Sequence, residues 1–169
     1  GKQLSSVEMK DATSLGLVKI DILGITELSI LSRAAALIGM DPLDYYNISL
    51  TDEKTMQGFR DLDVGGIFQF EGDSTKSVLR QIPNLNDFEQ LAACVALSKP
   101  GPAHSGGTTK YLARAKGATD VKGFDWHPIL ARITEPTYYQ IIYQEQVISI
   151  VREIGQMTWT DANAIRLFM

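Results

Sequence analysis

Asp21 lies at a position in the sequence where aspartate is unusual. Asp21 lies in the middle of residues 16–23, where apolar residues alternate with Lys19 and Asp21. This period of two, rich in β-branched residues, predicts a half-buried β-strand, and aspartate is disfavoured inside strands. A carboxylate on a rigid strand suits a divalent cation, and a nearby lysine suits a phosphate. A solvent-facing Lys19–Asp21 pair on an edge strand explains the same two residues, and single-residue reasoning favours it.

The elements that must position these residues are mostly helical. Apolar residues recur at i, i+3, i+4 and i+7 in several segments, which is typical of helices with one buried face. The predicted helices cover residues 26–40, 51–60 with Thr51 as the N-cap, 74–82, 86–97, 143–154 and 160–169 with Thr160 as the N-cap. We expect residues 65–70 to be extended, and residues 99–102 must interrupt a helix because they contain two prolines. We therefore expect a mainly α (α+β) fold, with one strand followed by about seven helices.

The composition is that of one compact domain with its own core. The chain has 169 residues, of which 44% are hydrophobic and 21% charged, and no apolar run approaches the ~20 residues that span a bilayer. The single cysteine, Cys94, lies in an apolar run, so a reducing cytoplasm is the expected location. The net charge of −4 argues against a self-sufficient nucleic-acid binder. That objection is weak for part of an enzyme, because metal sites contribute acidic residues.

Five segments, in this order, resemble family C DNA polymerases, the bacterial and phage-type DNA polymerase III alpha subunits. The segments are residues 16–24, 66–71, 96–102, 135–147 and 161–169. Each motif alone is a weak signal, but together they cover the chain from about Gly16 to its last residue. The resemblance implies that residues 1–24 are the end of a palm and that residues 25–169 are a helical fingers domain.

The resemblance implies a DNA-directed DNA polymerase that extends a primer by two-metal nucleotidyl transfer. Asp21 matches the third of three palm aspartates that hold Mg²⁺ in the complete enzyme. The first two lie on an Asp-x-Asp strand well upstream and are absent here. Residues 61–63 have that spacing but follow a predicted helix, so we treat them as coincidence. Our hypothesis is that the isolated chain does not polymerise DNA; labelled-nucleotide incorporation lost in Asp21→Ala would refute it. Whether the isolated chain binds any metal is left open.

The resemblance also implies which residues meet the substrate. Lys19 matches a lysine near the triphosphate or the primer end, and Lys99 and Arg166 match basic fingers residues that close over the nucleotide. Residues 135–146 match a segment that positions a fingers helix, from which Tyr143 or Gln144 faces the nucleotide. The implied partners are primer–template DNA, dNTPs and the remainder of the alpha subunit, with the sliding clamp and other replisome subunits in the complete enzyme, and no membrane.

Several positions depart from the family pattern. Lys99 replaces an arginine, which keeps the charge but loses the bidentate fork. Arg166 is followed by leucine where the family commonly has a second arginine, and residues 139–140 replace a small residue. Arg114 and Lys116 resemble a basic pair of the family, but we expect them to lie at a solvated helix end.

Two alternatives to a segment of a complete polymerase stay open. In the first alternative, the chain is one piece of a split polymerase that reassembles with partners. In the second, it is a non-catalytic DNA-binding or interaction module. Exposed apolar surface on residues 18–23 would favour the first. Salt-dependent binding to primed DNA without any dependence on metal would favour the second.

Overall fold

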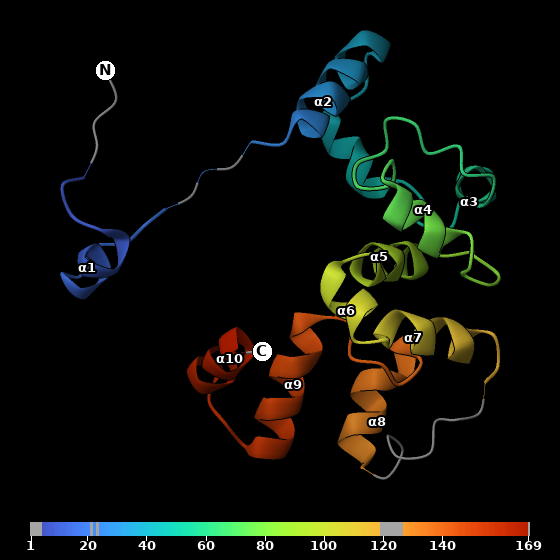
Figure 1. Cartoon of the computed structure of the whole chain (residues 1–169). Coiled ribbons are helices and arrows are strands. Elements are labelled where there is room, and N and C mark those ends of the chain that lie inside the picture. The colour runs from blue at the N-terminus through green and yellow to red at the C-terminus, as the bar shows by residue number, and fades with distance from the viewer. Residues whose placement is uncertain (1–4, 21, 23, 119–126, 169) are drawn as a thin grey trace. The chain divides into compact units, whose positions relative to one another are not determined.

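The computed structural model describes residues 5–20, 22, 24–118 and 127–168, and these residues are mainly helical (Figure 1). They form ten α-helices and two 3₁₀ helices and contain no strand. The mainly α class predicted from the sequence is confirmed. The chain divides into two units, residues 1–48 and 49–169. The predicted division at residue 24, between palm and fingers, stays a prediction.

The first unit holds few elements and almost no core. Its elements are α1 (Met9–Ser14), α2 (Thr26–Ile38) and the 3₁₀ helix η1 (Pro42–Asn47). The helix predicted over residues 26–40 is confirmed as α2, which ends where Gly39 adopts a positive φ of 69° that glycine tolerates. The Tyr45 hydroxyl donates to the Leu31 carbonyl at 3.0 Å and ties η1 to α2.

The strand predicted over residues 16–23 is absent from the described part of that segment. Val18, Ile20 and Ile22 have no regular secondary structure and are 83%, 79% and 93% exposed. Asp21 and Leu23 lie outside the described residues. The prediction is wrong here because a strand needs a neighbouring strand for its backbone N–H and C=O groups, and the described residues provide none.

The second unit contains the hydrophobic core. Its elements are α3 (Glu53–Arg60), α4 (Asp73–Leu79), α5 (Phe88–Leu97), α6 (Pro100–His104), α7 (Gly107–Ala115), α8 (Pro128–Thr134), η2 (Glu135–Thr137), α9 (Gln144–Gly155) and α10 (Trp159–Phe168). Buried apolar side chains from α3, α4, α5 and α7 and their connecting loops form one cluster. Within it the rings of Phe59 and Phe70 pack edge to face with centroids 4.9 Å apart, a favourable aromatic geometry.

Two predicted N-caps are displaced by one or two residues. Asp52, rather than Thr51, caps α3: its carboxylate accepts hydrogen bonds from the Thr55 hydroxyl and amide, both at 2.8 Å. These bonds hold the pKa of Asp52 below its usual value. Thr158, rather than Thr160, accepts the Asp161 amide at 3.2 Å at the start of α10. Several residues at each helix start carry suitable oxygens, so the pattern alone did not decide between them.

The predicted interruption at residues 99–102 is real but short. Helix α5 ends at Leu97, and α6 begins at Pro100. Proline suits the first helical position because its missing N–H would have no partner there in any case. The segment is therefore a corner between two helices.

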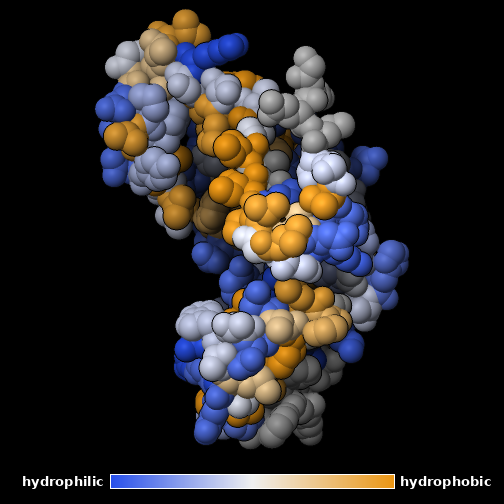
Figure 2. Space-filling model, turned by 90° about the vertical axis from the view of Figure 1, so that its left-hand side faces the viewer, coloured by the Kyte–Doolittle hydropathy of each residue, from blue (hydrophilic) through white to orange (hydrophobic). Residues whose placement is uncertain are grey.

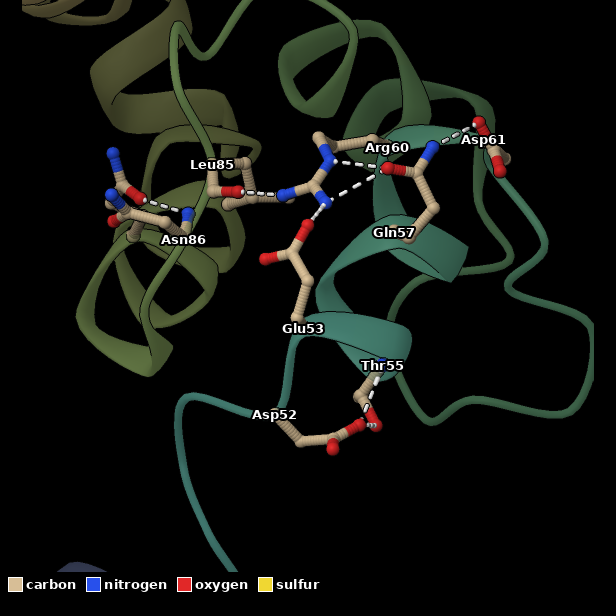
Figure 3. Close-up of polar contacts among 9 residues, drawn as sticks. Asp52, Glu53, Thr55, Gln57, Arg60, Asp61, Leu85 and Asn86 are labelled. Carbon is tan, nitrogen blue, oxygen red and sulfur yellow. Dashed lines mark hydrogen bonds and ion pairs between the residues drawn. The ribbon is translucent and has the colours of Figure 1, made fainter.

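Hydrogen bonds of Arg60 connect α3 to the loop that leads into α5 (Figure 3). Its guanidinium donates to the Leu85 carbonyl, to the Gln57 side-chain oxygen at 3.1 and 2.8 Å, and pairs with Glu53. Gln57 in turn donates to the Asp61 carboxylate at 2.8 Å. Asp61 is one of the two aspartates with Asp-x-Asp spacing. Its carboxylate therefore has a hydrogen-bond partner within α3.

We expect Gln156→Gly to stabilise the second unit by about 1 kcal/mol, because a side chain is disfavoured in the left-handed region. Gln156 ends α9 with φ 51° and is exposed, so its side chain buries little that glycine would lose. Urea unfolding measures the change. Gln156→Ala is the control and should gain nothing, since alanine keeps Cβ. Equal stability of the glycine and alanine variants would contradict the expectation.

Candidate functional site

Two of the predicted substrate residues meet between α9 and α10. The Arg166 guanidinium donates from Nη1 to the Gln144 side-chain oxygen at 2.6 Å and from Nε to the Asn163 side-chain oxygen at 2.9 Å. We call these three residues the Arg166 corner. Arg166 is only partly exposed, whereas Gln144 and Asn163 are exposed. A guanidinium held by neutral partners keeps its charge and retains donors for phosphate oxygens.

A cation–π contact helps to hold the two helices of the corner together. The guanidinium carbon of Arg152, on α9, lies 3.8 Å from the centroid of the Trp159 ring at the start of α10. Such contacts contribute about 0.5–1 kcal/mol at exposed sites. The two helices lie side by side in Figure 1 and are in contact. The contact fixes the connection between them and therefore the position of Arg166 relative to α9.

Gln146 positions the first turn of α9. Its side-chain oxygen accepts the amides of Ile142 and Tyr143 at 2.8 and 3.0 Å. Its side-chain nitrogen donates to the Ile133 carbonyl at 3.2 Å and to the Thr137 hydroxyl at 2.7 Å. All four hydrogen-bonding positions of the amide are used, as burial to 7% exposure requires. Sequence reasoning did not select Gln146, although a glutamine three residues into a helix is a capping-box signal.

Arg114 is buried, so the prediction of a solvated helix end is wrong for this residue. Arg114 is 8% exposed, and its Nη1 donates to the Tyr138 and Tyr139 carbonyls at 3.3 and 3.0 Å. Both tyrosines have positive φ, 51° and 57°, a conformation that costs a residue with a side chain about 1–2 kcal/mol. The buried cation therefore stabilises a strained turn between η2 and α9. Lys116 is exposed, as predicted.

A cavity of about 260 Å³ lies beside this turn and the start of α9. Its lining includes Asp87, Glu89, Tyr111, Tyr138 and Tyr143. Burial, with smaller contributions from Glu89 and another nearby carboxylate, raises the pKa of Tyr143 to about 12. The hydroxyl therefore stays neutral at physiological pH. Because the cavity is bordered by carboxylates, it repels anions.

Lys99, Lys19 and Asp21 are not among the three residues of the Arg166 corner. Lys99 is exposed at the start of α6. Lys19 is exposed within the first unit. Asp21 lies outside the described residues. The roles of all three, and those of Tyr143, Gln144 and Arg166 toward a substrate, stay predictions.

The described residues do not by themselves form a metal site. Across residues 5–20, 22, 24–118 and 127–168, no three histidine, cysteine, aspartate or glutamate side chains are grouped so as to hold an ion. No helix in the same residues is long and apolar enough to span a membrane.

The comparisons with known proteins point to one family. The sequence model of the bacterial DNA polymerase III alpha subunit finger domain matches residues 27–169. The chain is 35% identical over 170 residues to DNA polymerase III subunit alpha of Neisseria meningitidis. It is 32% identical over 176 residues to that of Escherichia coli and over 169 residues to that of Staphylococcus aureus.

Each of these alignments covers 98% of this chain, which spans 14–15% of the length of the relatives. The chain belongs to the family of bacterial DNA polymerase III alpha subunit finger domains. The resemblance found in the sequence motifs is thereby confirmed.

Proposed function

We propose that this chain serves as the fingers of a family C replicative DNA polymerase and grips the triphosphate of the incoming nucleotide. Family membership supports the class of enzyme. The observation that carries the assignment is the Arg166 corner, where a partly exposed guanidinium is held from two sides at 2.6 and 2.9 Å. A guanidinium fixed in this way loses little conformational freedom when it binds a phosphate.

Within this proposal the other predicted residues have distinct roles, and that of Gln144 differs from the contact with the nucleotide that the resemblance implied. Lys99, exposed at the helix corner, supplies a second positive charge to the triphosphate, and Lys19 serves the triphosphate or the primer end. Gln144 orients Arg166. Tyr143 lines the acid-bordered cavity, so we assign it to the base or sugar side of the nucleotide rather than to the phosphates.

We further propose that Asp21 is one of three carboxylates that hold Mg²⁺ in the complete enzyme. When bound, the ion supplies charge stabilisation for nucleotidyl transfer. The hypothesis that the isolated chain does not polymerise DNA follows from this role, because one aspartate does not hold both ions of a two-metal site with useful geometry. The other two carboxylates would come from the remainder of the alpha subunit.

The exposed apolar surface of the first unit supports an association with that remainder. Among the described core residues only Ala35 belongs to residues 1–48, and Figure 2 shows hydrophobic side chains open to solvent. A unit that buries so little apolar surface gains little stability by itself. We propose that the remainder of the alpha subunit covers it, in a cytoplasmic enzyme that works with primer–template DNA, dNTPs, a sliding clamp and other replisome subunits.

Arg166→Ala in the complete alpha subunit tests the proposed function. We expect the KM for dNTP to rise about tenfold or more, because charge-assisted hydrogen bonds contribute about 1.5–3 kcal/mol. Steady-state primer extension measures KM and kcat. Arg80→Ala is the matched control, since Arg80 is an exposed arginine of the second unit at the end of α4. An unchanged KM in the Arg166 variant would overturn the assignment.

The exposed residues 18–20 and 22 also favour a second candidate, one piece of a split polymerase. Val18, Ile20 and Ile22 are the apolar face that a partner strand would cover. The intact mass of the natural gene product decides between the two. A product far heavier than 18.6 kDa indicates a segment of a complete subunit, and a product of about that mass indicates a split enzyme.

A further inference from the structure

We infer that Arg114 is a positioning residue for the Arg166 corner. Arg114 lies on α7, and the corner is formed by α9 and α10. The inference rests on the proposed function only in that it treats Arg166 as the residue that meets the substrate. The structural part, that Arg114 determines where the start of α9 lies, stands on contacts alone.

The first step is the contact between Arg114 and the turn before α9. A single nitrogen, Nη1, donates to two consecutive carbonyls at 3.3 and 3.0 Å. Those carbonyls belong to Tyr138 and Tyr139, which both have left-handed backbone conformations. Two consecutive non-glycine residues in this region persist only when their surroundings hold them. The edge-to-face packing of Tyr111 on Tyr138, with ring centroids 5.1 Å apart, adds a second contact from α7.

The second step runs from the turn to the first residues of α9. The Thr137 hydroxyl, one residue before the turn, contacts the Gln140 carbonyl at 2.6 Å on its far side and accepts from the Gln146 side chain at 2.7 Å. Gln146 in turn accepts the amides of Ile142 and Tyr143. The turn and the N-terminus of α9 are therefore one hydrogen-bonded unit.

The third step reaches the corner. Gln144 is the first residue of α9, directly after Tyr143, and its side chain accepts from Arg166 at 2.6 Å. A shift of the turn would move the backbone of Tyr143 and Gln144 and so lengthen the bond to Arg166. Because catalytic and binding groups act only when they are held in the right geometry, the buried arginine controls the position of the exposed one.

Burial excludes a direct role of Arg114 in binding a phosphate. Its side chain is 8% exposed and is aimed at two backbone carbonyls, whereas phosphate-binding arginines need free donors at the surface. Its influence on a substrate must therefore pass through the turn.

The first test uses the 169-residue chain with ¹⁵N labelling. We expect Arg114→Met to shift the resonances of the Gln144 side-chain amide and the Arg166 Nε–H in the folded protein, with helix content unchanged by circular dichroism. Arg114→Lys should give smaller shifts, because one ammonium can still donate to both carbonyls. Arg80→Met, in an exposed arginine, should shift neither. Shifts that stay confined to residues 137–140 would overturn the inference, because a residue that only stabilises the fold leaves the native corner unchanged.

A second pair of variants keeps the test valid if Arg114→Met fails to fold. Thr137→Val keeps the shape of the side chain but removes the acceptor for Gln146, and Thr137→Ser retains it. We expect Thr137→Val to shift the Gln144 and Arg166 resonances and Thr137→Ser to leave them near the wild-type values. Equal behaviour of the two variants would overturn the path through Thr137.

The last test separates this inference from the proposed function. In the complete alpha subunit we expect Arg114→Met to raise the KM for dNTP about tenfold with kcat within about twofold. A loss of folded enzyme would lower kcat and leave KM unchanged, which would overturn the positioning role. If Arg166→Ala leaves KM unchanged, the proposed function fails, while the resonance shifts still report whether Arg114 positions the corner.

Discussion

Asp21→Asn in a complete alpha subunit is expected to lower the rate of primer extension by about a thousandfold, which corresponds to about 4 kcal/mol of transition-state stabilisation. An asparagine keeps the size of the side chain but lacks the negative charge that a hard divalent cation requires. The expectation depends on the proposed role of Asp21, which lies outside the described residues. Single-turnover extension of a primed template at saturating dNTP measures the effect.

Asp63→Asn is the matched control for that experiment. Asp63 is the second residue of the Asp-x-Asp-like pair, is exposed, and follows the turn after α3. If residues 61–63 have their spacing by coincidence, this variant extends primers at the wild-type rate. Near-normal turnover of Asp21→Asn would rule out a metal-binding role, and a large loss in Asp63→Asn would show that the wrong aspartate had been selected.

Leu97→Ala is expected to destabilise the second unit by about 3 kcal/mol. Leu97 is the last residue of α5 and is fully buried in the core cluster. Truncating a buried leucine removes apolar contacts and leaves a cavity, which together cost about 2–5 kcal/mol. Because small domains have about 5–15 kcal/mol of stability, the loss is a large fraction of the total. Urea unfolding followed by circular dichroism gives the free energy.

Leu167→Ala provides the control for the same side-chain truncation outside the core. Leu167 lies on α10 and is 69% exposed, and both leucine and alanine favour helices. We expect a change within about 0.5 kcal/mol. A similar loss in both variants would mean that Leu97 does not belong to a cooperative core of residues 49–169.

The sequence by itself determined the class of fold, the family and many of the helices. Residues 26–40, 86–97 and 143–154 carry apolar residues at helical spacing, and the structure confirms helices α2, α5 and α9 there. These predictions succeed because helical hydrogen bonds and amphipathic spacing are local, within about one turn. The motifs that indicated a family C polymerase are also local, and the family match over residues 27–169 confirms them.

Only the tertiary structure showed how the candidate site is held. Arg114 donates to carbonyls 24 and 25 residues away along the chain, and Gln146 reaches back to Ile133, so no local pattern indicates either contact.

The strand predicted over residues 16–23 is absent from residues 16–20 and 22 for the same physical reason. Its alternation is a local signal, but a strand forms only when another strand accepts its hydrogen bonds. Local spacing thus determined which residues can form a helix or a strand. Contacts between segments distant in the sequence decided which residues are buried, which are hydrogen-bonded and which position Arg166.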